Sequence, residues 1–300
     1  MHFLYFIVNK QSRNSESVFK ELLLILPKYR INYEFLVTES IEQLETLLSQ
    51  LKVTIQPSDI FVVVGGDGSL NQFVTYYNKY YFENAIGYIP AGSGNDFARA
   101  HNIPFDPEDA LLHLLSVEEK QELSIIVAEQ DKKQHVAVNS IGFGIDGLIG
   151  HLVESKGKKE KIGARSYIFG IFSGFLKQGK FPLTLTVDDG HYEFDQVHLA
   201  VVANNPSFAG GVYILPEASG KDDFLEILIA DNVSASNLTA IISRLLINQT
   251  HLDHPKIHSF QSKEVSIEIN SKQYAQKDGE VFLQDTFHYH FYTEKLPFWI

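Results

Sequence analysis

Two glycine-rich stretches contain the residues whose types and spacing could bind a phosphate. The first, from Val62 to Asn71, reads VVVGGDGSLN, and the second, from Pro90 to Arg99, reads PAGSGNDFAR. In the first stretch a β-branched run ends in glycines, an aspartate and a serine, and a possible helix follows. Such a turn lets the backbone approach an anion, at which the first N–H groups of the helix point. Taken alone, the pattern also fits a plain strand–turn–helix corner.

The second stretch adds oxygen atoms to the same kind of turn. Asn95 and Asp96 follow its glycines and can accept hydrogen bonds or hold a metal ion. Each stretch follows an apolar run that we interpret as a strand. Loops at the carboxyl ends of parallel strands converge on one crevice, which is where open α/β sheets bind their ligands.

The elements around these stretches alternate between strand and helix. Strands are predicted at residues 3–8, 33–37, 60–64 and 85–89, with helices such as 41–51 and 108–115 between or after them. This alternation predicts a mostly parallel sheet with crossover helices. From about residue 123, strands follow one another without long helices, which predicts a second, antiparallel β domain. We therefore expect an α/β domain over residues 1–122 and a β-rich domain over 123–290.

Composition excludes several classes of protein. The 300 residues include no cysteine, which rules out disulfides, thiolate metal sites and cysteine nucleophiles and suits a cytoplasmic location. A net charge of −12 argues against nucleic acid as the main partner. No apolar run approaches the ~20 residues that span a bilayer. The apolar start of the chain lacks a basic segment before it and a cleavage site after it, so we interpret it as a first strand.

Together, G-G-D-G-S-L-N and P-A-G-S-G-N-D-F-A-R resemble the two loops of the bacterial diacylglycerol kinase catalytic family of lipid kinases. NAD kinases and phosphofructokinases share the first motif, whereas the second is more specific to lipid kinases. The resemblance implies a diacylglycerol kinase-like α/β domain followed by a β-sandwich, with residues 291–300 returning to the first domain. It also implies ATP-dependent phosphorylation of a lipid, foremost diacylglycerol to phosphatidic acid. Such enzymes work at the inner face of the membrane, and relatives often dimerise.

The resemblance also implies residue roles in the first domain. Asp67 and Asp96 would hold the catalytic Mg²⁺, directly or through water, while backbone N–H groups and the ion neutralise the transferred phosphoryl group. The residues expected to form the ATP site are Asn9, Lys10, Gln11, Ser12, Arg13, Thr38, Gly65, Gly66, Asp67, Gly68, Ser69, Asn71, Gly92, Ser93 and Asn95.

In the second domain, Asp278-Gly279 lies between two alternating runs and is a strong signal for a two-residue hairpin. The plain interpretation is a surface hairpin. In the resembled family the same D-G-E sequence supplies the general base, which corresponds here to Glu280. The base would accept the proton of the lipid hydroxyl.

A second metal site is implied by the segment SGKDDFLE, in which Asp222 would be the carboxylate ligand and Ser219 and Phe224 would supply carbonyls. Oxygen-only ligands favour magnesium or calcium over zinc. Asp223 stands where the family has glycine, and an acidic turn without an ion is the alternative. The segment Asn139–Gly147 matches the family's N-x-x-G-x-G-x-D turn, with a loop between strand and helix as the alternative.

Residues 150–180 combine basic and aromatic side chains. An apolar segment from Tyr167 to Leu176 is flanked by Lys156, Lys158, Lys159, Lys161, Arg165, Lys177 and Lys180. A basic rim around an apolar segment predicts a membrane-interface element, and a core helix with solvated lysine ends is the alternative. The histidine pairs His251/His254 and His288/His290 have spacings that could bind metal, but no third ligand completes either set.

Three other functions fit parts of the sequence. An NAD kinase would share the GGDG turn, although Gly94–Phe97 only partly resembles the nucleoside motif of those enzymes. The acceptor could instead be a sphingoid base, phosphatidylglycerol or another lipid, since no residue identifies it. A nucleotide-binding regulator without turnover would also keep both loops, although Asp67, Asp96 and Glu280 argue for catalysis.

Overall fold

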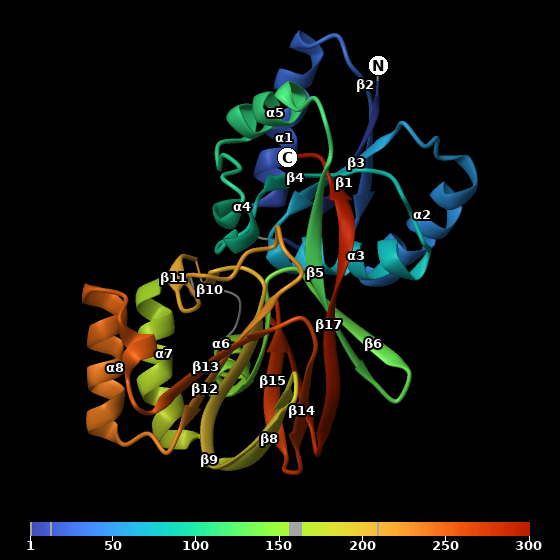
Figure 1. The fold of residues 1–300 in the computed structure, drawn as a ribbon. Coiled ribbons are helices and arrows are strands. Elements are labelled where there is room, and N and C mark those ends of the chain that lie inside the picture. The colour runs from blue at the N-terminus through green and yellow to red at the C-terminus, as the bar shows by residue number, and fades with distance from the viewer. Residues whose placement is uncertain (1, 13, 156–163, 209) are drawn as a thin grey trace. The chain divides into compact units, whose positions relative to one another are not determined.

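A computed structural model describes residues 2–12, 14–155, 164–208 and 210–300 (Figure 1). The chain divides into two compact units, one of residues 1–123 with 295–300 and one of residues 124–294. The first is an α/β unit with a mostly parallel sheet, and the second is built mainly of antiparallel strands. The predicted fold class is therefore confirmed.

The first unit is organised around four parallel strands in the order β4-β3-β1-β2. Their registers pair Asn9 with Thr38 and Gly65 with Pro90, so the four strands end at the same edge of the sheet. That edge is where both glycine-rich stretches begin. The strands are β1 (Phe3–Asn9), β2 (Asn32–Thr38), β3 (Ile60–Gly65) and β4 (Ile86–Pro90).

Helices cover both faces of this sheet because successive side chains of a strand point in opposite directions. Val62 and Val64 pack with apolar residues of α1 and α5. Phe61 lies on the opposite face, against the rings of Phe73 and Tyr77 from α3. The helices of this unit are α1 (Ser15–Ile25), η1 (Leu26–Lys28), α2 (Ile41–Thr54), α3 (Asp67–Lys79), α4 (Asp96–Ala100) and α5 (Pro107–Ser116).

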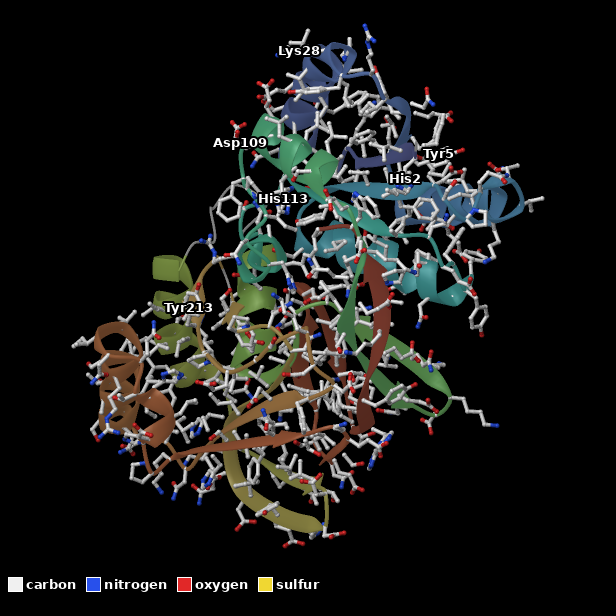
Figure 2. The ribbon with its side chains drawn as sticks, turned by 45° about the horizontal axis from the view of Figure 1, so that its top comes forward. His2, Tyr5, Lys28, Asp109, His113 and Tyr213 are labelled. Carbon is white, nitrogen blue, oxygen red and sulfur yellow. The ribbon has the colours of Figure 1, made fainter. Side chains whose placement is uncertain are left out.

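Two long-range connections close the first unit. Lys28 of η1 forms an ion pair of 3.2 Å with Glu108 of α5, beside the labelled Asp109 (Figure 2). The end of the chain also belongs here. Phe298 pairs in parallel with Ile86 of β4, and the indole N–H of Trp299 donates to the Leu114 carbonyl at 3.1 Å.

The second unit surrounds its own apolar core, which is rich in aromatic rings. Its strands pair antiparallel in the order β16-β15-β7-β9-β8-β14-β17, and β12 links β9 to β13. The strands beyond β4 are β5 (Gln121–Gln130), β6 (Lys133–Ala137), β7 (Ser140–Gly144), β8 (Phe181–Val187), β9 (Gly190–Ala203), β10 (Ser207–Phe208), β11 (Val212–Tyr213), β12 (Leu225–Asp231), β13 (Ile257–Ser262), β14 (Val265–Ile269), β15 (Gln273–Lys277), β16 (Glu280–Gln284) and β17 (Phe287–Phe298).

The expectation that strands follow one another here without long helices is wrong. The unit also contains α6 (Ile145–Ser155), α7 (Ala164–Lys177), α8 (Ala235–Ile247) and the short η2 (His251–Asp253). The apolar positions of α8, which include Leu238, Ile241, Ile242 and Leu245, follow helical spacing, and Ser234 begins the helix with a capping box. Across the described residues, no helix is long and apolar enough to cross a membrane.

Candidate functional site

The first glycine stretch forms a sharp connection between β3 and α3. The helix begins at Asp67, and its N-cap residue Gly66 provides no side chain to cap it. An uncapped helix start presents N–H groups and the positive end of the helix dipole, both of which favour an anion. A Cβ atom on Gly65 would lie 2.5 Å from Cβ of Ser69, so the turn needs glycine there.

The two glycine stretches lie directly against each other. A Cβ atom on Gly92 would lie 2.5 Å from Cα of Gly66 and 2.7 Å from the side-chain oxygen of Asn95. The Gly92 N–H donates to that oxygen at 2.9 Å, and Asn95 adopts a left-handed conformation with φ of 53°. Only glycine permits this close approach, so the contact explains why both stretches contain glycine here.

Asp67 joins the two stretches through both oxygens of its carboxylate. Oδ2 accepts from the Asp96 N–H at 3.1 Å, and Oδ1 accepts from the Phe97 N–H at 3.0 Å. The carboxylate therefore caps α4, on which Asp96 is buried. Burial, reinforced by the charges of Asp67 and Asp96, holds the pKa of the Tyr88 hydroxyl well above its usual range. The charges of both aspartates therefore act on the Tyr88 hydroxyl.

Residues at the ends of β1 and β2 extend this site. The Asn9 amide donates to the Ser69 hydroxyl at 3.1 Å and accepts from the Gln11 N–H at 2.9 Å. The Thr38 hydroxyl donates to the Val8 carbonyl at 3.4 Å. Lys10 pairs with Glu39 at 3.1 Å. Asn9, Thr38 and Ser69 therefore lie at the strand edge, while Lys10 and Gln11 interact with residues after β2.

The remaining predicted ATP-site residues differ in their exposure. Ser12 donates its N–H to the Asn9 carbonyl at 3.1 Å, and Gly68 lies in the first turn of α3. Asn71 is buried in the next turn, whereas Ser93 is exposed. Arg13 lies outside the described residues.

Sequence reasoning missed two supports of the site. The Tyr88 hydroxyl donates to the Gly65 carbonyl at 3.0 Å, which holds the end of β3 in place. The Asn14 N–H donates to the Ala91 carbonyl at 3.2 Å, which ties the loop after β1 to the second glycine stretch. A hydroxyl-bearing residue inside the apolar run AIGYIP was the signal for Tyr88.

In the second unit, the predicted hairpin at Asp278-Gly279 is present. Both loop residues have positive φ angles, 44° and 86°, as a type I′ turn requires. The Asp278 carboxylate accepts three backbone N–H groups at the start of β7, those of Val138 at 2.6 Å, Asn139 at 2.9 Å and Ser140 at 3.1 Å. The turn is therefore anchored to a neighbouring segment and is more than a surface hairpin.

Glu280, the predicted base, follows this turn at the start of β16. Its carboxylate lies 3.2 Å from the Lys277 ammonium, which is opposite it in the hairpin. The Glu280 side chain is 50% exposed and that of Lys277 is 13% exposed. A half-exposed carboxylate with a largely buried cation beside it can be reached by a substrate and has a defined position. Lys277 was not predicted, because alternation alone does not distinguish an ion pair from two solvated residues.

The segment Asn139–Gly147 is a strand followed by a helix, which corrects the prediction of a turn. β7 occupies Ser140–Gly144 and α6 begins at once. The motif residues make buried contacts: the Asn205 amide donates to the Asn139 side chain at 3.0 Å, and the Gln276 amide donates to Asp146 at 2.7 Å. A Cβ atom on Gly142 would overlap the Asp146 carboxylate, which explains the glycine.

The predicted metal turn lies just before β12. Asp222 Oδ1 accepts the Phe224 N–H at 2.9 Å, and the Lys221 N–H donates to the Ser219 hydroxyl at 3.3 Å. The Ser124 hydroxyl donates to the Asp222 carbonyl. The three predicted ligands therefore belong to one ordered turn with oxygen donors. Among the residues that the structure describes, no cluster of three His, Asp or Glu side chains is placed to hold a metal.

The basic and aromatic stretch is described only in part. Lys156, Lys158, Lys159 and Lys161 and the Arg165 side chain lie outside the described residues. In α7, Ile171 and Phe175 pack on the core, whereas Leu176 is 82% exposed beside Lys177. His251 and His254 do not form a metal pair: the His251 ring contacts the Ile214 carbonyl at 2.7 Å, and the His254 ring accepts the Lys256 N–H at 3.2 Å.

Comparison with known families identifies both parts of the chain. Residues 3–127 match the diacylglycerol kinase catalytic domain, and residues 139–288 match the YegS C-terminal NAD kinase β-sandwich-like domain. The chain belongs to the diacylglycerol kinase-like family of lipid kinases, within the wider NAD kinase-like group.

Individual relatives agree with this assignment. The chain is 26% identical over 297 residues to the "Putative lipid kinase YtlR" of Bacillus subtilis, covering 92% of this chain and 93% of the relative. It is 25% identical over 226 residues to a "Putative lipid kinase" of Staphylococcus epidermidis, covering 75% of this chain and 71% of the relative. A crystal structure of a "putative diacylglycerol kinase" from Bacillus anthracis has the same fold, with a TM-score of 0.77 and 18% sequence identity. The match covers 98% of this chain and 94% of that one.

Proposed function

We propose that this protein transfers the γ-phosphoryl group of ATP to a lipid hydroxyl, with diacylglycerol as the acceptor that the family description indicates. The observation that carries the proposal is the Asp67 carboxylate, which holds the two glycine loops together at 3.0 and 3.1 Å. This contact fixes an uncapped helix start beside a second glycine loop at the carboxyl edge of a parallel sheet. That combination is suited to a polyphosphate.

The residues of the first unit would bind and orient ATP. The N–H groups at the start of α3 face the phosphates, while Asn9, Thr38 and Ser69 border them at the strand edge. Asp67 and Asp96 offer the carboxylate oxygens that Mg²⁺ prefers, and their joint effect on Tyr88 fits a site that takes a cation. When bound, Mg²⁺ would neutralise charge on the phosphoryl oxygens.

Glu280 would accept the proton of the lipid hydroxyl as that oxygen attacks the γ-phosphorus. A carboxylate held in one position by Lys277 is available for this transfer. Asp222, with the carbonyls of Ser219 and Phe224, would hold a second Mg²⁺ of structural importance, since its donors are all oxygen. The exposed Leu176 and the neighbouring Lys177 on α7 support transient contact with a membrane surface.

The test is a screen with radiolabelled ATP against a bacterial lipid extract, followed by separation and identification of the labelled product. Diacylglycerol and NAD are assayed side by side with the extract. We expect a phosphorylated lipid whose formation needs Mg²⁺ and is abolished in Asp67→Ala. Labelling of NAD alone would indicate an NAD kinase, and ATP binding without any labelled product would indicate a regulator.

A further inference from the structure

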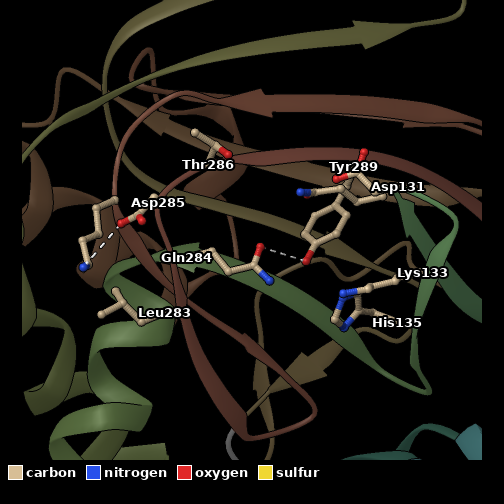
Figure 3. A pocket seen from close by; sticks show the side chains of 10 residues that line it. Asp131, Lys133, His135, Leu283, Gln284, Asp285, Thr286 and Tyr289 are labelled. Atoms are coloured by element: carbon tan, nitrogen blue, oxygen red, sulfur yellow. Dashed lines mark hydrogen bonds and ion pairs between the residues drawn. The ribbon is translucent and has the colours of Figure 1, made fainter.

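A polar pocket and an apolar cavity of the second unit have no part in the mechanism so far. The pocket has a volume of about 420 Å³, and its charged side chains compensate one another, as in the pair of Lys272 with Asp285 at 3.4 Å (Figure 3). The cavity has a volume of about 70 Å³ and lies between the sheet and the helices α7 and α8, which are side by side in Figure 1. Two buried histidines line it, and each has a ring nitrogen without a partner among the described residues. The cavity is therefore the better candidate for a ligand site.

Apolar side chains of the sheet and of both helices form the walls of this cavity. Because side chains alternate along a strand, Ala200 and Val202 of β9 belong to the aromatic core. Leu199 and Val201 point the other way and pack with the helical layer. The residues that line the cavity from the strands and helices include Leu199, Leu228, Ala230, Ile171, Phe175 and Ile241. Apart from the two histidines, every residue that lines the cavity is aliphatic or aromatic.

A β-bulge places the first histidine, His198, at the cavity. In the pairing of β9 with β12, successive residues of β12 pair with Leu199 and Val197, so His198 is an extra residue without an opposite partner. Regular alternation would direct its side chain toward the aromatic core, and a bulge re-aims such a side chain. The His198 ring stacks on Phe175 of α7 with centroids 4.8 Å apart and lines the cavity. Its Nδ1 has no partner among the residues that the structure describes.

The second histidine, His251 of η2, has a defined proton position. Its Nε2 lies 2.7 Å from the Ile214 carbonyl oxygen, which can only accept, so Nε2 carries the hydrogen. Burial lowers the pKa of His251, against the effects of the Ile214 contact and of Asp253, so the ring is neutral at pH 7. Nδ1 is therefore a hydrogen-bond acceptor, His251 is 2% exposed, and no described residue donates to that nitrogen. A buried acceptor without a donor is unfavourable, so a ligand that supplies the donor gains affinity.

These features select an uncharged ligand that has an aliphatic body and a hydroxyl group. An ion would lose its hydration and find no opposite charge among the lining residues. A pure hydrocarbon would fill the space but would leave Nδ1 of His251 without a donor. A single water needs about two to four polar partners and would fill only part of the cavity. A hydroxyl group on a chain supplies the donor while the chain contacts the apolar walls.

We propose that this cavity binds a single-chain aliphatic alcohol, whose hydroxyl group donates to Nδ1 of His251. The same hydroxyl can accept from the His198 ring when that ring carries its proton on Nδ1. Because the cavity is partly open, a chain longer than the cavity can extend to the surface. The site lies within the second unit, and it goes beyond the proposed phosphoryl transfer, which uses neither histidine.

Binding is measured on the full-length protein by NMR of ¹³C-labelled isoleucine methyl groups. Six isoleucines line the cavity, and Ile60 and Ile89 of the first unit serve as internal controls. The probes are 1-hexanol, hexyl methyl ether, which cannot donate, and hexanoate, which is charged. We expect hexanol to shift the cavity isoleucines saturably and to bind about tenfold more tightly than the ether, because the alcohol alone satisfies His251. Hexanoate should not bind, since no opposite charge lines the cavity.

Two variants separate the role of the hydroxyl group from that of the cavity. His251→Phe keeps a ring but removes the acceptor, so hexanol should bind about tenfold more weakly and no better than the ether. Ala230→Ile fills the cavity and should prevent saturable binding of both. His258→Phe is the matched control and should bind both as wild type does, because the His258 ring packs on Phe194 with centroids 5.0 Å apart and does not line the cavity.

Two results would overturn the inference. One is that hexanol causes no saturable shift of the cavity isoleucines. The other is that the wild-type protein binds the alcohol and the ether equally, which would mean that His251 needs no donor from a ligand. Both results come from the wild-type protein, so they decide the matter even if a variant does not fold.

Discussion

Asp67 in the first unit and Asp278 in the second each use a carboxylate to join two segments that are distant in the sequence. Asp67 accepts two backbone N–H groups at the start of α4, and Asp278 accepts three at the start of β7. Their neighbours differ. The charges of Asp67 and Asp96 both act on the Tyr88 hydroxyl, whereas the acid beside Asp278 is Glu280, which is paired with Lys277. The second site therefore contains an ion pair, whereas in the first the Asp67 carboxylate accepts two backbone N–H groups.

This difference separates two tasks within the proposed reaction. In the proposed reaction, Asp67 and Asp96 would hold the Mg²⁺ that phosphoryl transfer requires. A carboxylate paired with an ammonium has a fixed position but remains accessible, which suits a base. The first three predictions test whether each aspartate is structural and whether Glu280 acts as the base, and the fourth concerns a buried histidine of the second unit.

The largest effect is expected for Glu280→Gln. The amide keeps the shape but cannot accept a proton, so kcat for lipid-dependent ATP turnover falls by about 10²–10⁴-fold. The unfolding free energy stays within about 0.5 kcal/mol because the side chain is half-exposed. Glu268→Gln, at an exposed position of β14, is the matched control and keeps full activity. If the Glu280→Gln enzyme kept wild-type turnover, Glu280 would not be the general base.

The next effect compares the two aspartates in stability. Asp278→Ala leaves three backbone donors without their acceptor and is expected to lower the unfolding free energy by about 2–4 kcal/mol. Asp67→Ala leaves two backbone donors without an acceptor and is expected to lower the unfolding free energy by about 1–3 kcal/mol. Turnover should be lost in this variant as well. Urea unfolding monitored by circular dichroism measures both, with the exposed Asp195→Ala as control. An Asp278→Ala protein as stable as wild type would contradict the structural role.

Lys277→Met tests the ion pair that distinguishes the second site. Without the ammonium, Glu280 loses its fixed position, and kcat is expected to fall about tenfold, equivalent to about 1.4 kcal/mol. Lys277→Arg restores most of the rate, because it keeps the charge. Stability should change little, because Glu280, the partner left without its ion pair, is half-exposed and remains solvated. If kcat fell equally in Lys277→Met and Lys277→Arg, the effect of Lys277 would come from its packing and not from its charge.

The comparison also shows what the sequence could predict. Local signals were sufficient for the glycine turns, the Asp278-Gly279 hairpin and the parallel strands, since each depends on neighbouring residues. The contacts of Tyr88 and of the Asp278 carboxylate could not be predicted, because their partners, the Gly65 carbonyl and the N–H groups of residues 138–140, lie far along the chain. The Lys277–Glu280 ion pair spans only three residues, but alternation alone does not distinguish an ion pair from two solvated side chains. The helix α8 does have local signals, a helical spacing of apolar residues and a capping box at Ser234, so it was predictable from the sequence. The split of Asn139–Gly147 into strand and helix required the pairing of β7 with β15.

The smallest effect concerns the helical layer of the second unit. His198 is 4% exposed and its ring stacks on Phe175 at 4.8 Å. Burial lowers its pKa below the usual value of 6.5, with help from Lys180 and against the effect of Asp231. Because the folded state holds this ring neutral, the unfolded state binds more protons near and below pH 6.5. The neutral His198 ring therefore makes its full contribution to the unfolding free energy above that pH, and this contribution is lost as the pH falls.

His198→Phe keeps the ring stack and removes the titration. The unfolding free energy, measured in urea between pH 5 and 7.5, should therefore decline less steeply on the acid side in the variant than in wild type. The two aspartate variants behave differently, because losing a contact between a carboxylate and a backbone N–H lowers the unfolding free energy even at neutral pH. At neutral pH, His198 does not change how the unfolding free energy depends on pH. Identical pH profiles for His198→Phe and wild type would mean that the ring does not control the acid sensitivity of this layer.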